Sequence, residues 1–232
     1  MHDTQAFARA VRPDPRANRF INPQPLTPDG KLEATRRLET LQVRRSDDVL
    51  LRGKPVEPDA QGDYPVGSVG RFIAAGEGGP AVVTVVRERD GWKVDLRWWL
   101  AMLDMQNTAE PTPGSPEHAI RNLTLALIAL NREAALRFAV PGADVRVLFA
   151  GAPPYREPSG VLEASAMEMP LVEVGPGEFY RMPSGGVVEG STADDRKVIV
   201  GQFGPVEMPF VLRRVGGVWR VEAEPYFAVI NR

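Results

Sequence analysis

The sequence contains no cysteine among its 232 residues. Disulfide bonds, thiolate metal sites and a cysteine nucleophile are therefore excluded. Histidine is also scarce, because His2 and His118 are the only two, so a zinc site has too few ligands and we expect no metal. The glycine-rich run 76–80 lacks the lysine and the following helix of a phosphate-binding loop, and no Gly-x-Ser-x-Gly elbow is present. We expect no bound cofactor.

Neither sign of charge is in excess, and no long apolar run is present. The 28 basic and 30 acidic residues give a formal net charge of −2, which supplies no basic surface for nucleic acid. The longest apolar run, 123–130, is far shorter than the roughly 18–20 residues that cross a bilayer. Residues 1–11 lack the basic segment and apolar core of a signal peptide. We expect no nucleic-acid partner and no membrane span, while the cytoplasm and export with a removed leader both stay open.

One strand-turn-strand pattern occurs twice in the chain. Residues 83–104 align with residues 209–231 once a single inserted residue is allowed. The matched pairs are Trp92 with Trp219, Val94 with Val221, Asp95 with Glu222, Trp99 with Tyr226, and Ala101 with Ala228. A repeat at a distance of about 127 residues indicates two related units rather than one large domain.

Turn residues and periodicity divide the chain into four parts. The proline-containing residues 1–26 predict an extended arm with little helix. Residues 27–106 predict an abridged first α+β unit, which opens with a helix from Thr27 to about Arg44. The polar residues 107–114 predict a linker. Residues 115–232 predict a second α+β domain.

Within these units, period-two patterns and turn residues predict antiparallel strands. In the first unit, the predicted strands are 49–51, 69–74, 81–89 and 92–102. The second unit opens with a helical pattern over 116–139 that is broken near Asn131. The strands predicted after it are 145–149, 167–174, 178–182, 197–202, 208–214 and 218–230.

The stretch 115–144 resembles the opening helices of the nuclear-transport-factor-2-like superfamily, which includes SnoaL-like polyketide cyclases and ketosteroid isomerases. The residues that carry the resemblance are the capped start Ser115-Pro116-Glu117, the amphipathic helix from Ile120 to Leu130, the second helix with Glu133-Ala134-Ala135-Leu136, and the exit Pro141-Gly142-Ala143-Asp144. The glycine turn before Trp219-Arg220-Val221 is also similar to that superfamily's final strands. The resemblance implies helices packed on a curved antiparallel sheet, forming a cone with an apolar cavity, in two related units of which the first is abridged.

Folds of this kind host isomerases, cyclases, dehydratases, non-catalytic binders and dimerisation modules, so the fold alone does not choose a function. Our leading hypothesis is a non-catalytic module that binds a small apolar molecule or a protein in or on the cone. One alternative is an isomerase- or cyclase-like enzyme that uses a buried carboxylate with Tyr180 or His118. Another is a structural scaffold or dimerisation protein, in which the two units fill each other's cavities with Trp98 and Phe227. A homodimer also stays open as the assembly.

The alternation in the two repeated strands predicts one face toward a core and one charged face toward solvent. We expect four residues to line the ligand site: Trp98, Tyr180, Arg181 and Phe227. Trp99 and Tyr226 fall on the charged faces, where exposed aromatic residues are typical of an interface. His118 stands at the third position of its helix, where the helix dipole favours the neutral ring. With no evident acidic partner, an exposed first-turn residue is favoured over a catalytic base.

Overall fold

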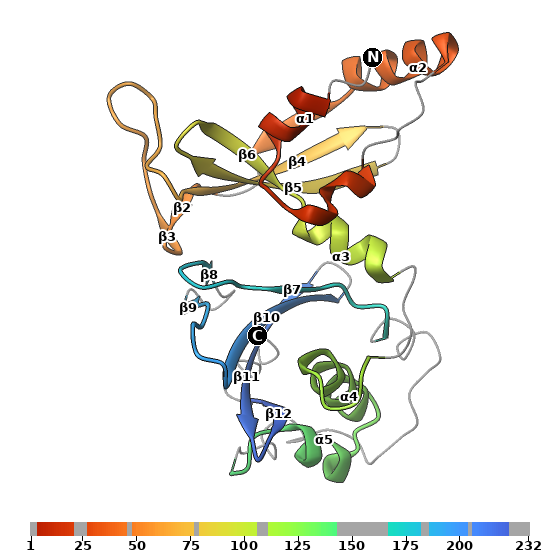
Figure 1. Cartoon of the computed structure of the whole chain (residues 1–232), viewed down its shortest axis with the longest axis vertical. Coiled ribbons are helices and arrows are strands. Elements are labelled where there is room, and N and C mark those ends of the chain that lie inside the picture. The colour runs from red at the N-terminus through yellow and green to blue at the C-terminus, as the bar shows by residue number, and fades with distance from the viewer. Residues whose placement is uncertain are drawn as a thin grey trace. The chain divides into compact units, whose positions relative to one another are not determined.

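We describe the fold from a computed structural model of the chain, which divides into two compact units, Met1–Leu100 and Ala101–Arg232. Both units combine helices with antiparallel sheets (Figure 1), which confirms the predicted α+β class. The division falls inside the helix α3 (Arg97–Met105), ahead of the predicted linker 107–114. The structure describes residues 4–20, 27–45, 48–76, 79–105, 111–142, 167–181, 186–203 and 206–222.

The first unit begins with helical segments and continues as a six-stranded antiparallel sheet of order β3-β2-β4-β5-β6, with β1 also paired to β4. Its elements are α1 (Thr4–Ala10), the 3-10 helix η1 (Pro15–Phe20), α2 (Pro28–Glu39), β1 (Gln42–Arg45), β2 (Leu50–Leu51), β3 (Lys54–Pro55), β4 (Val69–Gly76), β5 (Gly79–Glu88) and β6 (Gly91–Asp95).

Two predictions about helices in the first unit are wrong: that residues 1–26 are an extended arm, and that the helix capped by Thr27 ends near Arg44. The arm 1–26 is not extended where it is described, because its prolines separate helical segments rather than interrupt them: Pro13 lies between α1 and η1, and Pro15 begins η1, where no amide donor is needed. The helix capped by Thr27, whose Oγ1 accepts from the Gly30 amide at 3.2 Å, ends at Glu39 and not near Arg44. The residues after it pair with β4 as the strand β1.

The predicted strand 92–102 is confirmed only as far as Asp95, where β6 ends, and is wrong beyond it, because α3 follows. The Asp95 carboxylate accepts from the Arg97 backbone amide at 3.0 Å, and the Leu100 amide donates to the Leu96 carbonyl at 2.9 Å. A side chain that satisfies the first free amides turns the chain into a helix. Leucine, alanine and methionine then favour the helix.

The second unit packs two helices on a four-stranded antiparallel sheet of order β12-β11-β10-β7, with β8 and β9 as a separate hairpin. Its elements are α4 (Pro116–Ile128), α5 (Arg132–Phe138), β7 (Leu171–Glu173), β8 (Phe179–Arg181), β9 (Val187–Glu189), β10 (Arg196–Phe203), β11 (Val206–Val215) and β12 (Val218–Val221).

The predicted helix break is confirmed: Leu130 has a positive φ of 54°, and Asn131 caps α5 by accepting from the Ala134 amide at 3.0 Å. The strands predicted at 178–182, 197–202 and 208–214 are found as β8, β10 and β11. Strand β7 is shorter than predicted, and so is β12, which ends at Val221 with Glu222 outside it. The predicted strand 145–149 lies outside the described residues.

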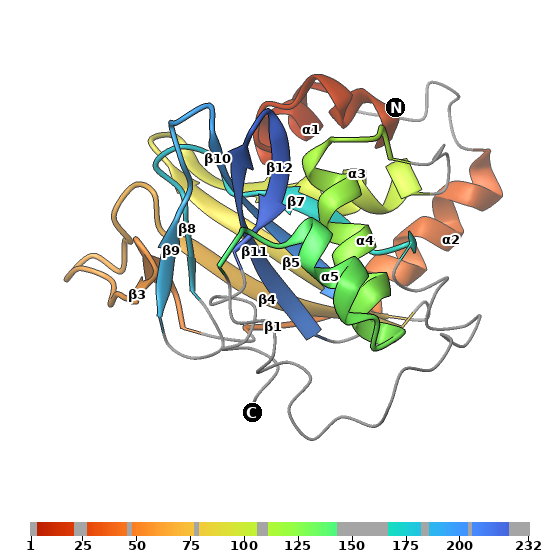
Figure 2. The same cartoon turned by 90° about the horizontal axis from the view of Figure 1, so that it is seen from below.

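The helix α4 lies against one face of this sheet, where β10 and β11 curve around it (Figure 1), with α5 beside it (Figure 2). The packing there is tight, because a Cβ added to Gly201 would stand 2.7 Å from Met169 Sδ and 3.1 Å from the Phe210 ring. The buried cluster consists of Ala119, Ile120, Leu123, Ala126, Ala135, Met169, Ile199, Met208, Phe210, Leu212, Trp219 and Val221. Apolar side chains therefore fill the space between helix and sheet that these residues enclose.

The repeat seen in the sequence has the same pairing register in both units. Trp92 of β6 stands opposite Arg87 of β5, and Trp219 of β12 stands opposite Arg214 of β11. Each hairpin closes with a two-residue turn, before Gly91 in one unit and before Val218 in the other. The matched residues therefore occupy the same positions in two hairpins of the same form.

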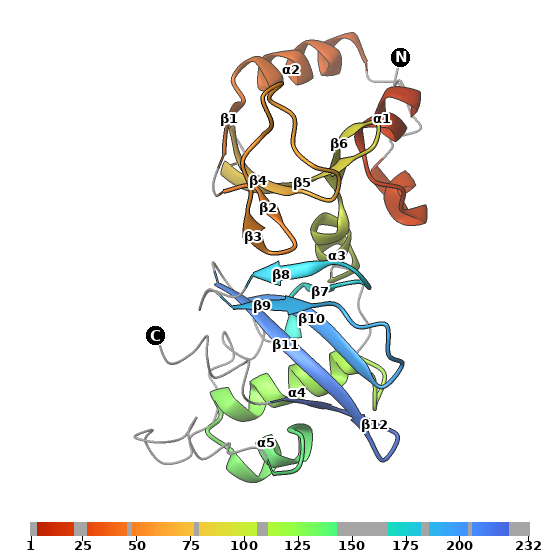
Figure 3. The same ribbon diagram turned by 90° about the vertical axis from the view of Figure 1, so that its left-hand side faces the viewer.

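The correspondence extends to a helix that the sequence alignment does not include. The residue after α1, Val11, forms a parallel bridge with Val94, as Ala139 after α5 does with Val221. In both units, the next amide donates to the carbonyl of the bridged valine at 2.9 Å. Figure 3 shows α1 beside β6 in this way. By these contacts α1 is the counterpart of α5.

A basic side chain of the last strand also reaches the end of that helix in both units. The Lys93 ammonium donates to the Arg9 carbonyl, and the Arg220 guanidinium donates to the Arg137 carbonyl at 2.6 Å. Cations are favoured at the carbonyl end of a helix, where the backbone acceptors lack partners. Two positions of the repeat, 93 and 220, thus perform the same task.

Burial of the two strands differs between the units. In β12 the face of Trp219 and Val221 is buried under α4, as predicted. In β6 the prediction is wrong: Trp92 is 38% exposed, whereas Lys93 and Asp95 are buried. The chain after α1 covers the charged side of β6 and supplies polar partners there, which makes this burial possible.

Candidate functional site

Tyr180 is buried and engaged with a carboxylate. It lies on β8, opposite Val188 of β9, and its hydroxyl donates to Oε2 of Glu207 on β11 at 3.0 Å. Glu207 alternates along β11 with Met208 and Phe210, which belong to the cluster under α4, so Glu207 projects from the other face of the sheet. Figure 3 likewise shows β8 on the side of the sheet away from α4. Tyr180 therefore lies outside the helix-covered interior in which a cone-type fold would hold its ligand.

The β8–β9 hairpin that carries Tyr180 is held at its base by close backbone packing. The Gly190 amide donates to the Glu178 carbonyl at 2.9 Å, and the Glu178 carboxylate accepts from the Gly175 amide at 2.8 Å. A Cβ on Gly190 would stand 2.0 Å from the Gly175 carbonyl oxygen. The two backbone segments can approach this closely because position 190 has no side chain.

We expect Gly190→Ala to separate these segments and to destabilise the hairpin by about 1–3 kcal/mol, as overpacking against backbone does. Hydrogen exchange of the β8 and β9 amides should accelerate, while exchange in α4 stays unchanged. Gly177→Ala is the reference variant, because its added Cβ meets nothing within 4 Å and it carries only the backbone strain of a φ of +73°, so its acceleration should be smaller. Equal acceleration in both variants would refute the role given to the close approach at Gly190.

The contacts of His118 join α4 to α5. Its backbone amide donates to the capping Ser115 Oγ at 3.1 Å, and its ring meets the Phe138 ring edge-on, with the centroids 5.7 Å apart. The Asn122 side-chain amide Nδ2 donates to the His118 backbone carbonyl at 2.8 Å. These contacts give the half-buried His118 a packing role at the start of α4.

The other predicted site residues are dispersed or lie outside the described residues. Trp98 and Trp99 are half-buried neighbours on α3, where helical spacing turns their side chains in different directions. Arg181 is exposed on β8, next to Tyr180 and therefore on the other side of that strand. Tyr226 and Phe227 lie outside the described residues.

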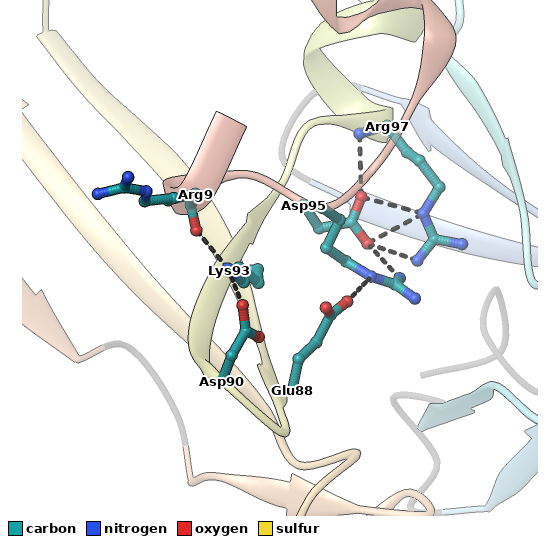
Figure 4. Close-up of polar contacts among 7 residues, drawn as sticks. Arg9, Glu88, Asp90, Lys93, Asp95 and Arg97 are labelled. Carbon is teal, nitrogen blue, oxygen red and sulfur yellow. Dashed lines mark hydrogen bonds and ion pairs between the residues drawn. The ribbon is translucent and has the colours of Figure 1, made fainter. Parts of the chain in front are cut away.

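An ionic cluster centred on the buried Asp95 and Lys93, which the sequence pattern did not indicate as a site, lies between α1 and β6 (Figure 4). The Asp95 carboxylate, 4% exposed, accepts from Arg97 Nε at 2.9 Å and from Arg12 Nη1 at 3.4 Å. Arg12 also reaches Glu88 at 3.3 Å. Lys93 bridges the Arg9 carbonyl and Asp90 Oδ2, the latter at 2.7 Å. The cluster ties the segment after α1 to the last strand of the sheet.

The electrostatics of this cluster favour the ionised carboxylate. Burial by itself would raise the pKa of Asp95, but the hydrogen bonds and the charge of Arg97, with the charge of Arg12, outweigh it and hold the pKa below its usual value. A carboxylate held in this way is a weak proton acceptor, so it suits an ion pair better than acid–base chemistry. The alternation in β6 placed Asp95 on a charged face, but no sequence signal indicated that the arm would cover it.

Arg121 is a further buried charge that the sequence pattern did not indicate. It lies on α4 and is 6% exposed, within a helix whose neighbouring residues Ile120 and Leu123 form the core. Burial lowers the pKa of Arg121, while the charge of Glu117 one turn earlier raises it. Arg121 follows Ile120 in the sequence, and nothing in this local pattern indicated that the arginine would be buried.

Among the described residues, no three histidine, aspartate or glutamate side chains gather as metal ligands do. No helix in this part of the chain has the length and apolar character needed to cross a membrane. Comparison of the chain with protein-family models, with curated proteins and with solved structures gave no significant match.

Proposed function

We propose that this chain is a non-catalytic protein-binding module built from two related units, the second of which has the nuclear-transport-factor-2-like fold. The fold proposal is supported by α4 and α5, the sharp break between them, and the parallel approach of Ala139 to Val221 before the antiparallel strands. The first unit repeats the helix, the parallel bridge and the closing hairpin.

One observation carries the choice of a protein rather than a small molecule as the partner. The face of the sheet under α4 is occupied by the chain's own side chains, of which Ile120, Phe210 and Leu212 are fully buried. The clash that a Cβ on Gly201 would cause supports a filled interior between β10 and α4. A ligand cavity of the usual size, on the order of 300–1,000 Å³, would require these residues to move apart.

The contacts of the residues that could act as acids or bases support the proposal of a non-catalytic function. The Tyr180 hydroxyl donates to Glu207 outside the helix-covered face, His118 packs on Phe138, and Asp95 is held ionised by arginines. General acid–base catalysis needs such a group directed at a substrate. In this chain the three groups connect elements of the fold to one another.

Native mass spectrometry of the purified full chain, compared with its mass under denaturing conditions, tests the proposal. We expect the native mass to equal that of the polypeptide, as a monomer or a defined oligomer. A reproducible extra mass that leaves on denaturation would contradict the filled interior and would support a small-molecule binder or an enzyme. Gly201→Leu is the matched test: in a filled interior it lowers the free energy of unfolding by about 1–3 kcal/mol or more, and in an open one it is tolerated.

A further inference from the structure

An aromatic surface lies on the first unit, on one side of β6. We define the Trp92 face as Trp92 and Val94 of β6, Arg87 of β5, Arg45 of β1, and Tyr64 from the turn region before β4. Trp92 is 38% exposed and meets the Tyr64 ring edge-on, with the centroids 5.7 Å apart. Tyr64 and Val94 are half-buried. Tryptophan, tyrosine and arginine are the residue types enriched among binding hot spots of protein interfaces.

The second unit contains the same face in a covered state. Trp219 and Val221 have the hairpin register of Trp92 and Val94, and each hairpin is joined to a helix end by the same parallel bridge. Strand direction and pairing fix the side on which a residue projects, so the two faces correspond. In the second unit, α4 packs on this face and leaves Trp219 only 9% exposed. An amphipathic helix therefore fits a hairpin face of this form.

Two guanidinium groups lie on the Trp92 face. Arg87 stands opposite Trp92 and pairs with the exposed Asp63 at 3.4 Å. The exposed Arg45 donates to the Tyr64 hydroxyl at 3.3 Å, which places its charge next to the aromatic pair. Asp63 pairs with Arg87, whereas the Arg45 charge stands beside the aromatic pair, so a partner with acidic residues beside its apolar stripe complements Arg45.

We propose that the Trp92 face binds an amphipathic helix of a partner protein, with acidic residues flanking the apolar stripe of that helix. This inference rests on the proposed protein-binding function and specifies its surface and its partner. The helix would lie against Trp92 and Val94 as α4 lies against Trp219 and Val221, and its acidic residues would meet Arg45.

The probe is a blocked, fluorescent peptide with the sequence of residues 115–131, which contains α4, titrated into the full chain and followed by anisotropy. We expect saturable binding that Trp92→Ala weakens at least about tenfold. A peptide carrying Arg121→Glu should bind at least about threefold more tightly, because it adds an acidic residue. Val218→Ala is the control: it truncates an exposed apolar residue of the hairpin in the second unit and should leave binding unchanged.

Several results would overturn the inference: no binding, equal binding of a scrambled peptide, no loss in Trp92→Ala, or tighter binding of a proline-rich peptide, which is extended rather than helical. A dimer that Trp92→Ala abolishes would also overturn it, by assigning the face to a second copy of this chain. A dimer, or tighter binding of the proline-rich peptide, would still agree with the proposed protein-binding function. Failure of that function is seen separately, as a retained small molecule in native mass spectrometry. Far-UV circular dichroism of each variant establishes that it is folded.

Discussion

Trp219→Ala is expected to destabilise the second unit by about 3–5 kcal/mol, the usual cost of removing a buried aromatic side chain and leaving a cavity. Trp219 is 9% exposed and belongs to the cluster that includes Ile120 and Phe210. Urea unfolding followed by far-UV circular dichroism measures the loss. Hydrogen exchange then locates it, because the β11 and β12 amides should exchange faster than in the unchanged protein.

The repeat supplies a matched control for this experiment. Trp92→Ala removes the same side chain from the same position of the other hairpin, but Trp92 is 38% exposed. We expect a loss of about 1 kcal/mol, from the contact with the Tyr64 ring and the partial burial. Equal losses in the two variants would mean that the Trp92 face is as buried in solution as its counterpart, and would argue against its role as a docking surface.

The repeat in the sequence predicted the two hairpins, because turn residues and alternation are local signals, but the shared pairing register is seen only in the structure. Alternation predicted the tryptophan face as the covered one in both hairpins, which is confirmed for Trp219 and wrong for Trp92. Coverage depends on segments far away in the chain: Arg12 lies 83 positions before Asp95, the carboxylate that it pairs with. Alternation indicates that the two faces differ, and the element that packs on them decides which face is buried.

Two elements of the first unit were mispredicted for different reasons. The run from Trp92 to Met102 alternates well enough for a strand, but a short apolar run does not distinguish strand from helix, and the carboxylate of Asp95 decides in favour of a helix start. The helix α1 was hidden by the prolines after it. Its counterpart α5 offered a signal, since Ala6 and Arg9 stand before Val11 as Ala134 and Arg137 stand before Ala139.

The candidate site was predicted only in part. Tyr180 was selected from its place in a strand, and it is buried and hydrogen-bonded. Its partner Glu207 was not selected, because it lies on a strand 27 positions later and the crossing of the two segments is a tertiary feature. Asp95 and Arg121 were missed for the same physical reason: burial of a charge depends on partners that the local pattern does not show.

The second large effect on stability is expected at Asp95, which the repeat matches with Glu222. Asp95→Asn is expected to destabilise the first unit by about 2–3 kcal/mol, because it leaves Arg97 and Arg12 around a site that has lost its negative charge. The figure lies below that for a fully buried pair, because both arginine side chains are 32% exposed. Glu222→Gln is the matched control: Glu222 pairs with Arg213, which is 61% exposed, so we expect a loss below about 1 kcal/mol.

The pH dependence separates the ion pair from simple packing. Arg97 and Arg12 hold the pKa of Asp95 in the folded chain below its value of about 3.9 in the unfolded chain, so the unfolded state binds the proton more readily. The stabilisation is therefore complete above about pH 5 and is lost as the pH falls through the folded pKa. The difference between the wild type and Asp95→Asn, measured by urea unfolding, should be constant from pH 5 to 7 and should shrink below about pH 4. A difference that persists unchanged at pH 3 would mean that Asp95 acts through its shape and hydrogen bonds, and the ionic attachment of the chain after α1 to β6 would be refuted.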